Sequence, residues 1–197
     1  YVPVSVSLLE NVTVGLYGNY YETTNALKLL ILQMIALHSY DELKIMLIAD
    51  EYEEKTFNFV RCIPHFWDDE KLVRFFATNE DEVKELSAYI ERNILSRNVS
   101  SGMDSVMPTP HYVIISTNKK LSEKCEALQQ LLKLKKNKGF SILLSQAELK
   151  DLPKETKFVI SVNGEQSRVF DREDTTGRGI TFSIDKVNET VVDNLSK

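Results

Sequence analysis

Three continuous apolar runs limit the fold of this chain more than any other feature of its sequence. Each run is short and is bounded by polar residues. Such runs are typical of strands that a parallel sheet buries on both faces, because helices cover both sides of that kind of sheet. The runs span residues 44–50, 111–116 and 140–145.

Helical patterns lie between these runs. The segment 24–38, with Thr23 or Thr24 as its N-cap, has apolar residues around nearly its whole circumference, so we expect a buried helix. A second helix is predicted over 79–97, opened by a capping box that begins at Thr78. Its apolar residues fall at helical spacing on one face, at Val83, Leu86, Ile90 and Ile94.

The rest of the chain extends the same pattern. Two short strands with a turn at 9–11 precede the first helix, and the second of them covers 12–16. A third helix is expected from Ser122 to Leu132, and the tail supplies three short strands and a helix over 185–195. Strands that alternate with helices in this way predict an α/β fold, a three-layer sandwich with a mainly parallel sheet.

The composition is that of one soluble domain, so we treat residues 1–197 as a single unit. Lys and Arg number 24 against 29 Asp and Glu, a formal net charge of −5. Nucleic-acid binders usually carry a positive balance, so we expect no nucleic-acid partner. The longest apolar run is too short to cross a bilayer. Because the chain begins at Tyr1 without an initiator Met, we expect a fragment of a larger protein.

The loop at 17–22 is the candidate functional site, because ligands of open parallel sheets bind at the carboxyl ends of the strands. A strand, a Gly-containing loop and a buried helix give the layout of a phosphate-binding loop. The motif G-x-x-x-x-G-K-[ST] is not completed in either possible register. Counted from Gly15, its last three positions hold Tyr20, Tyr21 and Glu22; counted from Gly18, they hold Thr23, Thr24 and Asn25.

These replacements oppose phosphate binding. The tyrosines add bulk where glycine lets the backbone approach a phosphate, and Glu22 brings a carboxylate towards a polyanion. We therefore expect a degenerate phosphate loop, whose remnant consists of Gly15, Gly18, Thr23 and Thr24. The segment 47–51, LIADE, has the hhhhDE form of a Walker B strand. We favour a neighbouring strand there, because the segment follows the first helix directly, and the Walker B interpretation stays open.

Several segments of the chain resemble one family: VGLYG, ALKLLILQMIALHSYDELKI, RCIPHFWDD, TPHYVIIS and GFSILLSQ. The family is that of the FtsK/SpoIIIE-type ATPases, RecA-like P-loop motors, and within it the type VII secretion ATPases called EssC in firmicutes and EccC in mycobacteria. LHSYDELK and IPHFWDD are the most specific segments. The resemblance is to the domain between the transmembrane helices and the first ATPase module, and the tract KETKFVISVNGEQSRVFD favours the EssC branch.

The resemblance implies a RecA-like P-loop NTPase fold with degenerate Walker motifs. It places the Walker B strand at 110–117, so that Ser116 and Thr117 occupy the Asp-Glu positions, and it places Gln146 at a sensor position. Neither Ser nor Thr can hold a magnesium-bound water or act as the acidic base. With the Walker A lysine also missing, we expect no catalytic residue and no cofactor.

The function implied by the resemblance is that of a non-hydrolysing structural or regulatory module of a type VII secretion motor, in a cytoplasmic domain of a bacterial cell-membrane protein. The alternative is an atypical nucleotide-binding domain with weak or residual ATPase activity. The implied partners are the neighbouring ATPase modules and membrane segment of the same protein and other membrane components of the secretion system. A homo-hexamer of the full-length protein is a further option.

An aromatic cluster is the remaining candidate. It is either a hydrophobic plug beneath a mobile loop at 97–110 or a docking surface, since Trp and Phe are common interface anchors. Its members are Pro64, His65, Phe66 and Trp67. The three histidines are far apart in sequence and no CxxC occurs, so we expect no metal site.

Overall fold

The three apolar runs form buried strands in the computed structural model. They are β2 (Leu43–Ile48), β4 (His111–Ser116) and β5 (Phe140–Gln146). Except for His111 and Gln146 at the strand ends, every residue in them is buried. They are neighbours in the sheet, and their burial is as the sequence predicts.

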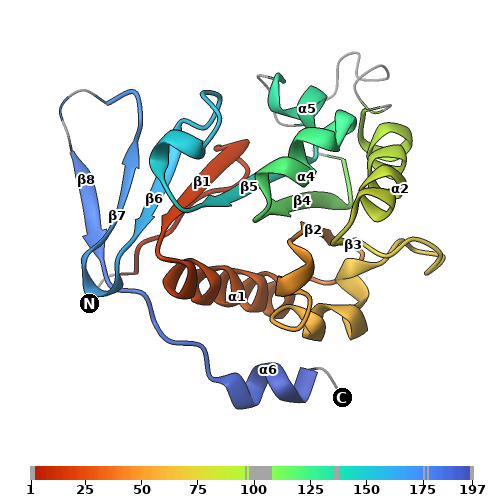
Figure 1. Cartoon of the computed structure of the whole chain (residues 1–197), viewed down its shortest axis with the longest axis horizontal. Coiled ribbons are helices and arrows are strands. Elements are labelled where there is room, and N and C mark those ends of the chain that lie inside the picture. Colours follow the sequence, from red (N-terminus) through yellow and green to blue (C-terminus); the bar gives the residue numbers. More distant parts are fainter. Residues whose placement is uncertain are drawn as a thin grey trace.

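The sheet has eight strands in the order β3-β2-β4-β5-β1-β6-β7-β8 (Figure 1). The structure describes residues 3–95, 97, 108–134, 138–174, 176 and 178–195. The strands from β3 to β6 in this order pair in parallel, and β7 and β8 add an antiparallel hairpin at one side. The remaining strands are β1 (Thr13–Gly18), β3 (Phe76–Ala77), β6 (Phe158–Val162), β7 (Ser167–Asp171) and β8 (Gly179–Phe182).

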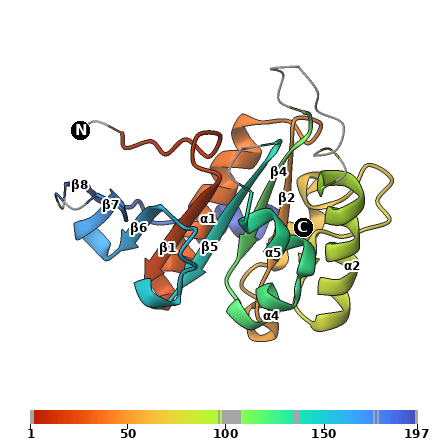
Figure 2. The same ribbon diagram turned by 90° about the horizontal axis from the view of Figure 1, so that it is seen from above.

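Helices cover the sheet from both sides (Figures 1 and 2). On one side lie α1 (Tyr20–Leu37) and α6 (Glu189–Leu195), with short 3-10 helices between residues 51 and 66. On the other side lie α2 (Glu80–Ile90), α4 (Lys119–Lys124) and α5 (Glu126–Leu132). This arrangement confirms the predicted three-layer α/β sandwich with a mainly parallel sheet.

Helix α1 differs from the prediction in two ways. It begins at Tyr20 rather than near Thr24, because Asn19 caps it: the Asn19 side chain accepts a hydrogen bond from the Tyr21 backbone N–H. The helix is also only half buried. Ala26, Leu27 and Ile31 belong to the core, whereas the C-terminal end of the helix is exposed to solvent and Leu37 is 76% exposed.

Other element boundaries also differ from the predictions. The strand expected before the turn at 9–11 does not form within the described residues, which begin at residue 3. Helix α2 is capped by Asn79 instead of Thr78 and continues as a π-helical turn over Glu91–Leu95. The expected helix from Ser122 is split at Cys125, whose backbone is extended. Helix α6 begins four residues later than expected, and most of the predicted mobile loop at 97–110 lies outside the described residues.

Candidate functional site

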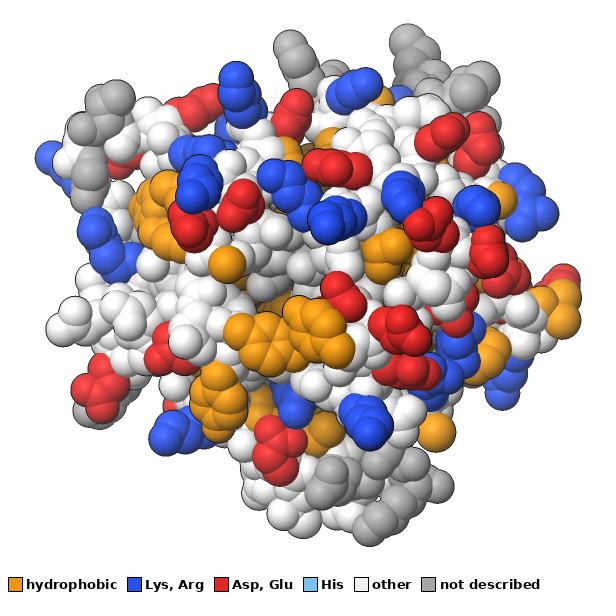
Figure 3. All heavy atoms as spheres, in the orientation of Figure 1, with side chains coloured by type: hydrophobic (Ala, Val, Ile, Leu, Met, Phe, Trp, Pro, Cys, Tyr) orange, Lys and Arg blue, Asp and Glu red, His pale blue; other side chains and the backbone are white. Residues whose placement is uncertain are grey.

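The carboxyl ends of the parallel strands meet at one edge of the sheet, at the bottom of Figure 2 and towards the viewer in Figure 1. In open α/β sheets this edge is where ligands bind. Three strands end at this edge in residues of the predicted site: β1 at Gly18, β4 at Ser116 and β5 at Gln146. The residues that follow strands here include Asn19 after β1, Asp50 after β2, Thr78 after β3 and Thr117 after β4. In Figure 3, hydrophobic side chains gather near the middle of the same face, among acidic and basic ones.

The connection from β1 to α1 at this edge consists of a single residue. Strand β1 ends at Gly18 and helix α1 begins at Tyr20, so only Asn19 lies between them. The predicted loop at 17–22 is therefore wrong: Tyr20, Tyr21 and Glu22 form the first helical turn. A phosphate loop encloses the anion with several consecutive backbone N–H groups, and one residue cannot form such a cradle.

The N–H groups that open α1 are partly occupied. The Asn19 side chain accepts from the Tyr21 N–H at 2.9 Å, and the Asn19 carbonyl accepts from the Thr23 N–H at 2.9 Å. The hydroxyl of Thr23 donates to the Asn19 and Tyr20 carbonyls at 3.0 and 3.1 Å. Thr23 and Thr24 are both buried, and the Thr23 hydroxyl is directed back along its own helix.

The two glycines of the expected remnant are required by packing within the chain. A Cβ on Gly18 would lie 2.2 Å from the Val162 carbonyl oxygen of β6, and its φ is +152°. A Cβ on Gly15 would lie 2.6 Å from the Leu152 side chain and 2.7 Å from that of Thr156. Both positions therefore need glycine whether or not a phosphate is ever present.

The strand order brings the other predicted positions to the same edge. Strand β5 lies between β1 and β4, and Gln146 is the register partner of Tyr17. Ser116 ends the next strand, and its hydroxyl donates to the Asn118 carbonyl at 3.2 Å and contacts the Ser122 hydroxyl. The alternative Walker B segment 47–51 belongs to β2, which β4 and β5 separate from β1. Strand β4 therefore lies closer to β1 in the sheet than β2 does.

A polar network that sequence reasoning missed joins β2 to β4. The Thr117 hydroxyl donates to the Glu53 carboxylate, and the Asn118 amide donates to Asp50 Oδ2 at 2.8 Å. Glu53 also accepts from the Asp50 N–H at 3.0 Å and is 2% exposed. The only signal in the sequence was the acidic end of the LIADE segment. The residues that complete the network lie 64 and 68 positions away.

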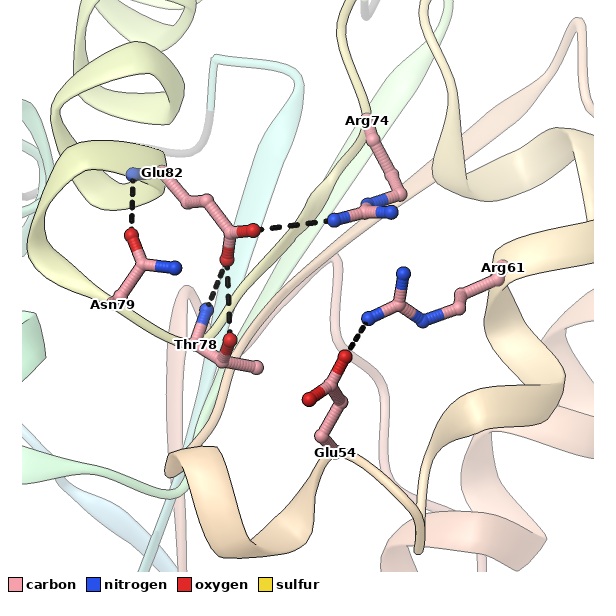
Figure 4. Close-up of polar contacts among 6 residues, drawn as sticks. All are labelled: Glu54, Arg61, Arg74, Thr78, Asn79 and Glu82. Carbon is pink, nitrogen blue, oxygen red and sulfur yellow. Dashed lines mark hydrogen bonds and ion pairs between the residues drawn. The ribbon is translucent and has the colours of Figure 1, made fainter.

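Arginines at the outer side of this edge are paired with the chain's own carboxylates (Figure 4). The Arg74 guanidinium contacts Glu82 at 3.2 Å, and Glu82 also accepts from the Thr78 backbone N–H at 2.7 Å. Arg61 forms an ion pair with Glu54. Neither arginine is thus free to replace the missing Walker A lysine.

The cluster at 64–67 lies away from this edge, and its members separate. His65 and Phe66 are buried, whereas Pro64 is exposed and Trp67 partly exposed. The His65 Nε2 lies 2.9 Å from the His38 carbonyl oxygen, and burial lowers the pKa of His65. Pro64 and Trp67 line a shallow cavity of about 300 Å³ together with Tyr40, Lys44 and Asp69. A docking role for this cluster therefore has to rest on Pro64 and Trp67.

None of the helices in the described part of the chain combines the length and the apolarity that spanning a bilayer requires. No group of three or more His, Cys, Asp or Glu side chains comes together there in a way that could hold a metal ion.

Fold and site together define a class of protein. A mainly parallel sheet covered by helices on both faces, with a strand–turn–helix unit at its carboxyl edge, is a three-layer α/β domain of the kind that binds ligands at this edge. No protein-family model matches the chain. The chain is 27% identical over 149 residues to the ESX secretion system protein YukB of Bacillus subtilis (strain 168). That match covers 76% of the chain and 10% of YukB.

Solved structures give the same result for the fold. The cytoplasmic domain of the Thermomonospora curvata type VII secretion ATPase EccC matches with a TM-score of 0.63 at 10% identity, over 94% of this chain and 25% of that one. EssC (ATPases 2 and 3) from Geobacillus thermodenitrificans matches with a TM-score of 0.67 at 10% identity, over 96% and 43%. The sequence and fold matches confirm the resemblance to the EssC/EccC-type secretion ATPases. The chain spans about a tenth of the length of its curated relative.

Proposed function

We propose that this chain is a non-hydrolysing structural module of a type VII secretion ATPase. The observation that carries the proposal is the connection of β1 to α1 through Asn19 alone. A loop of one residue removes the phosphate cradle together with the lysine that would reach the β- and γ-phosphates. Losing one charge-assisted contact of this kind costs about 1.5–3 kcal/mol, which is roughly tenfold to a hundredfold in affinity.

The second half of the site supports the same proposal. Hydrolysis of a nucleotide needs a carboxylate that positions magnesium and the attacking water. The end of β4 offers hydroxyls instead, and those of Ser116 and Thr117 are engaged within the chain. The nearby carboxylates of Asp50 and Glu53 accept hydrogen bonds from Asn118 and Thr117. Gln146 alone could not carry the reaction.

The place of the module within its parent is part of the proposal. Because YukB is about ten times longer than the match, we propose that further modules accompany this one. The EssC structure and a second Thermomonospora curvata EccC structure each comprise ATPases 2 and 3, which supports neighbouring ATPase modules as its partners. We place the domain on the cytoplasmic side, in the EssC branch, between the membrane segment and the first ATPase module. There it would link the two and support assembly of the motor with other membrane components.

Phosphate release tests the non-hydrolysing part directly. The purified chain is incubated with Mg-ATP, and inorganic phosphate is followed over time beside Thr23→Ala and Thr24→Ala variants. We expect no release above the buffer blank for any of the three proteins. Sustained release that a threonine variant abolishes would establish the alternative, an atypical nucleotide-binding domain with residual ATPase activity.

A further inference from the structure

Aromatic side chains are exposed at the edge where a nucleotide would lie. Tyr20 and Tyr21 begin α1, and Tyr52 lies in the short 3-10 helix Glu51–Glu53 that follows β2. Their exposed fractions are 50%, 75% and 70%. The rings of Tyr20 and Tyr52 lie 6.2 Å apart at 54°, so the two segments present one patch. We call these three residues the tyrosine patch.

Carboxylates without a cationic partner adjoin the tyrosine patch. Asp50 and Glu51 precede Tyr52 in sequence; Asp50 is partly exposed and Glu51 is exposed. Within the described residues neither of them takes part in an ion pair. Burial, followed by the charges of Glu53 and Asp50, raises the pKa of Tyr52, as expected when carboxylates lie near its hydroxyl.

Two arginines and a lysine near this edge are engaged elsewhere. Arg61 and Arg74 are paired with Glu54 and Glu82 (Figure 4). Lys119, which follows Asn118, lies 3.7 Å from Asp151. The edge therefore presents exposed aromatic rings beside the Asp50 and Glu51 carboxylates, which form no ion pair with the described residues.

We propose that the tyrosine patch and the adjoining carboxylates form a docking surface for an arginine- or lysine-bearing segment of a protein partner. A guanidinium can stack on an exposed tyrosine ring while its N–H groups pair with a carboxylate. A nucleotide fits poorly here, because its phosphates would meet the same carboxylates. The inference rests on the proposed function, since the edge is available to a protein only if no nucleotide occupies it.

Amide NMR of the ¹⁵N-labelled chain tests this surface. The probe is a hexapeptide that alternates glycine and arginine, and its control is the same peptide with neutral citrulline in place of arginine. We expect the arginine peptide to shift amides of residues 18–24 and 50–54 and the citrulline peptide to leave them in place. A Glu51→Gln/Tyr52→Ala variant should weaken binding at least about threefold.

A matched variant controls for general attraction to an acidic protein. Glu70→Gln/Leu72→Ala removes an exposed carboxylate and an exposed apolar side chain elsewhere and should bind the arginine peptide as the parent chain does. No shifts with the arginine peptide, shifts spread evenly over acidic surfaces, or equal binding of the citrulline peptide would each overturn the inference.

A separate titration with Mg-ATP distinguishes the two proposals. If neither ATP nor the arginine peptide binds, the docking surface is refuted and the non-hydrolysing module stands. If ATP shifts the amides of residues 18–24, a nucleotide occupies the edge and the docking surface is refuted, while phosphate release decides separately whether the module is non-hydrolysing.

Discussion

Gly18 ends β1 at a point where the backbones of β1 and β6 come very close. A Cβ there would lie 2.2 Å from the Val162 carbonyl oxygen, and the φ of +152° disfavours any L side chain. We expect Gly18→Ala to lower the free energy of unfolding by about 2–3 kcal/mol, measured by urea denaturation. This loss would occur without any nucleotide, because Gly18 serves the sheet.

Gly164 provides the matched control. Its φ is +50°, but a Cβ there would meet only the Glu22 side chain, at 3.2 Å. Gly164→Ala should therefore cost less, about 1 kcal/mol. If Gly18→Ala were as stable as the parent chain, or less harmful than Gly164→Ala, the packing explanation of Gly18 would be wrong.

His111 makes the stability of the fold depend on pH. Its Nε2 lies 2.9 Å from the Ser141 hydroxyl, which donates to the Leu8 carbonyl at 2.6 Å. Burial, followed by the charges of Arg97 and His38, lowers the pKa of His111 to about 4. In the unfolded chain the pKa is about 6.5, so between these values the unfolded state binds more protons than the folded state.

The contribution of His111 is therefore complete above pH 6.5 and is lost as the pH falls towards 4. We expect the free energy of unfolding to decrease by on the order of 2 kcal/mol across this window, with allowance for partial exposure of the ring. Urea denaturation at several pH values measures the decrease. His111→Gln should make the pH dependence shallower, and an unchanged slope would show that other groups cause it.

At the scale of elements, apolar pattern predicted strands better than it predicted helix ends. Strand β4 has the predicted bounds because every residue after His111 is buried. The sequence predicts the N-cap of α1 at Thr23 or Thr24, because it assigns the tyrosines before them to a loop. Asn19 satisfies the first N–H groups instead, as Asn79 does for α2. Nothing in the local sequence around Cys125, with neither Gly nor Pro, indicates the break between α4 and α5.

Two side chains of α1 hold the C-terminal segment. The Asn25 amide donates to the Asp185 carbonyl at 2.9 Å and accepts from the Val187 N–H at 2.9 Å. Lys28 adds an ion pair to Glu189 at 3.0 Å. Because the two hydrogen bonds of Asn25 join the start of this segment to α1, we expect Asn25→Ala to speed amide hydrogen exchange over 187–195 by about tenfold.

The effect should stay local. Gln33→Ala, an exposed substitution on the same helix, should leave the exchange of that segment unchanged. Exchange over the strands β2, β4 and β5 should be the same in both variants, because their protection reports global unfolding. A uniform increase across these strands in Asn25→Ala would contradict a local role for Asn25.

At the scale of the whole molecule, the sequence predicted the layers but not the order of the strands. Gly18, Ser116 and Gln146 were singled out separately, and the strand order brings them to one edge. The sequence did not predict what fills that edge. The contact between Thr117 and Glu53 joins residues 64 positions apart, and the length of the β1–α1 connection depends on where the strand ends. Both follow from tertiary packing, which no local pattern records.

The molecule is a three-layer α/β sandwich whose carboxyl edge is occupied by its own polar contacts and by exposed tyrosines. Our central claim is that this edge does not bind a nucleotide. The claim concerns the folded chain as a whole, because the missing cradle and the engaged β4 hydroxyls come from different elements.

Isothermal titration calorimetry of the chain with Mg-ATP tests this claim most directly. We expect only heats of dilution, which corresponds to a dissociation constant above about 1 mM. Binding tighter than about 100 μM that either Thr23→Ala or Thr24→Ala abolishes would contradict it.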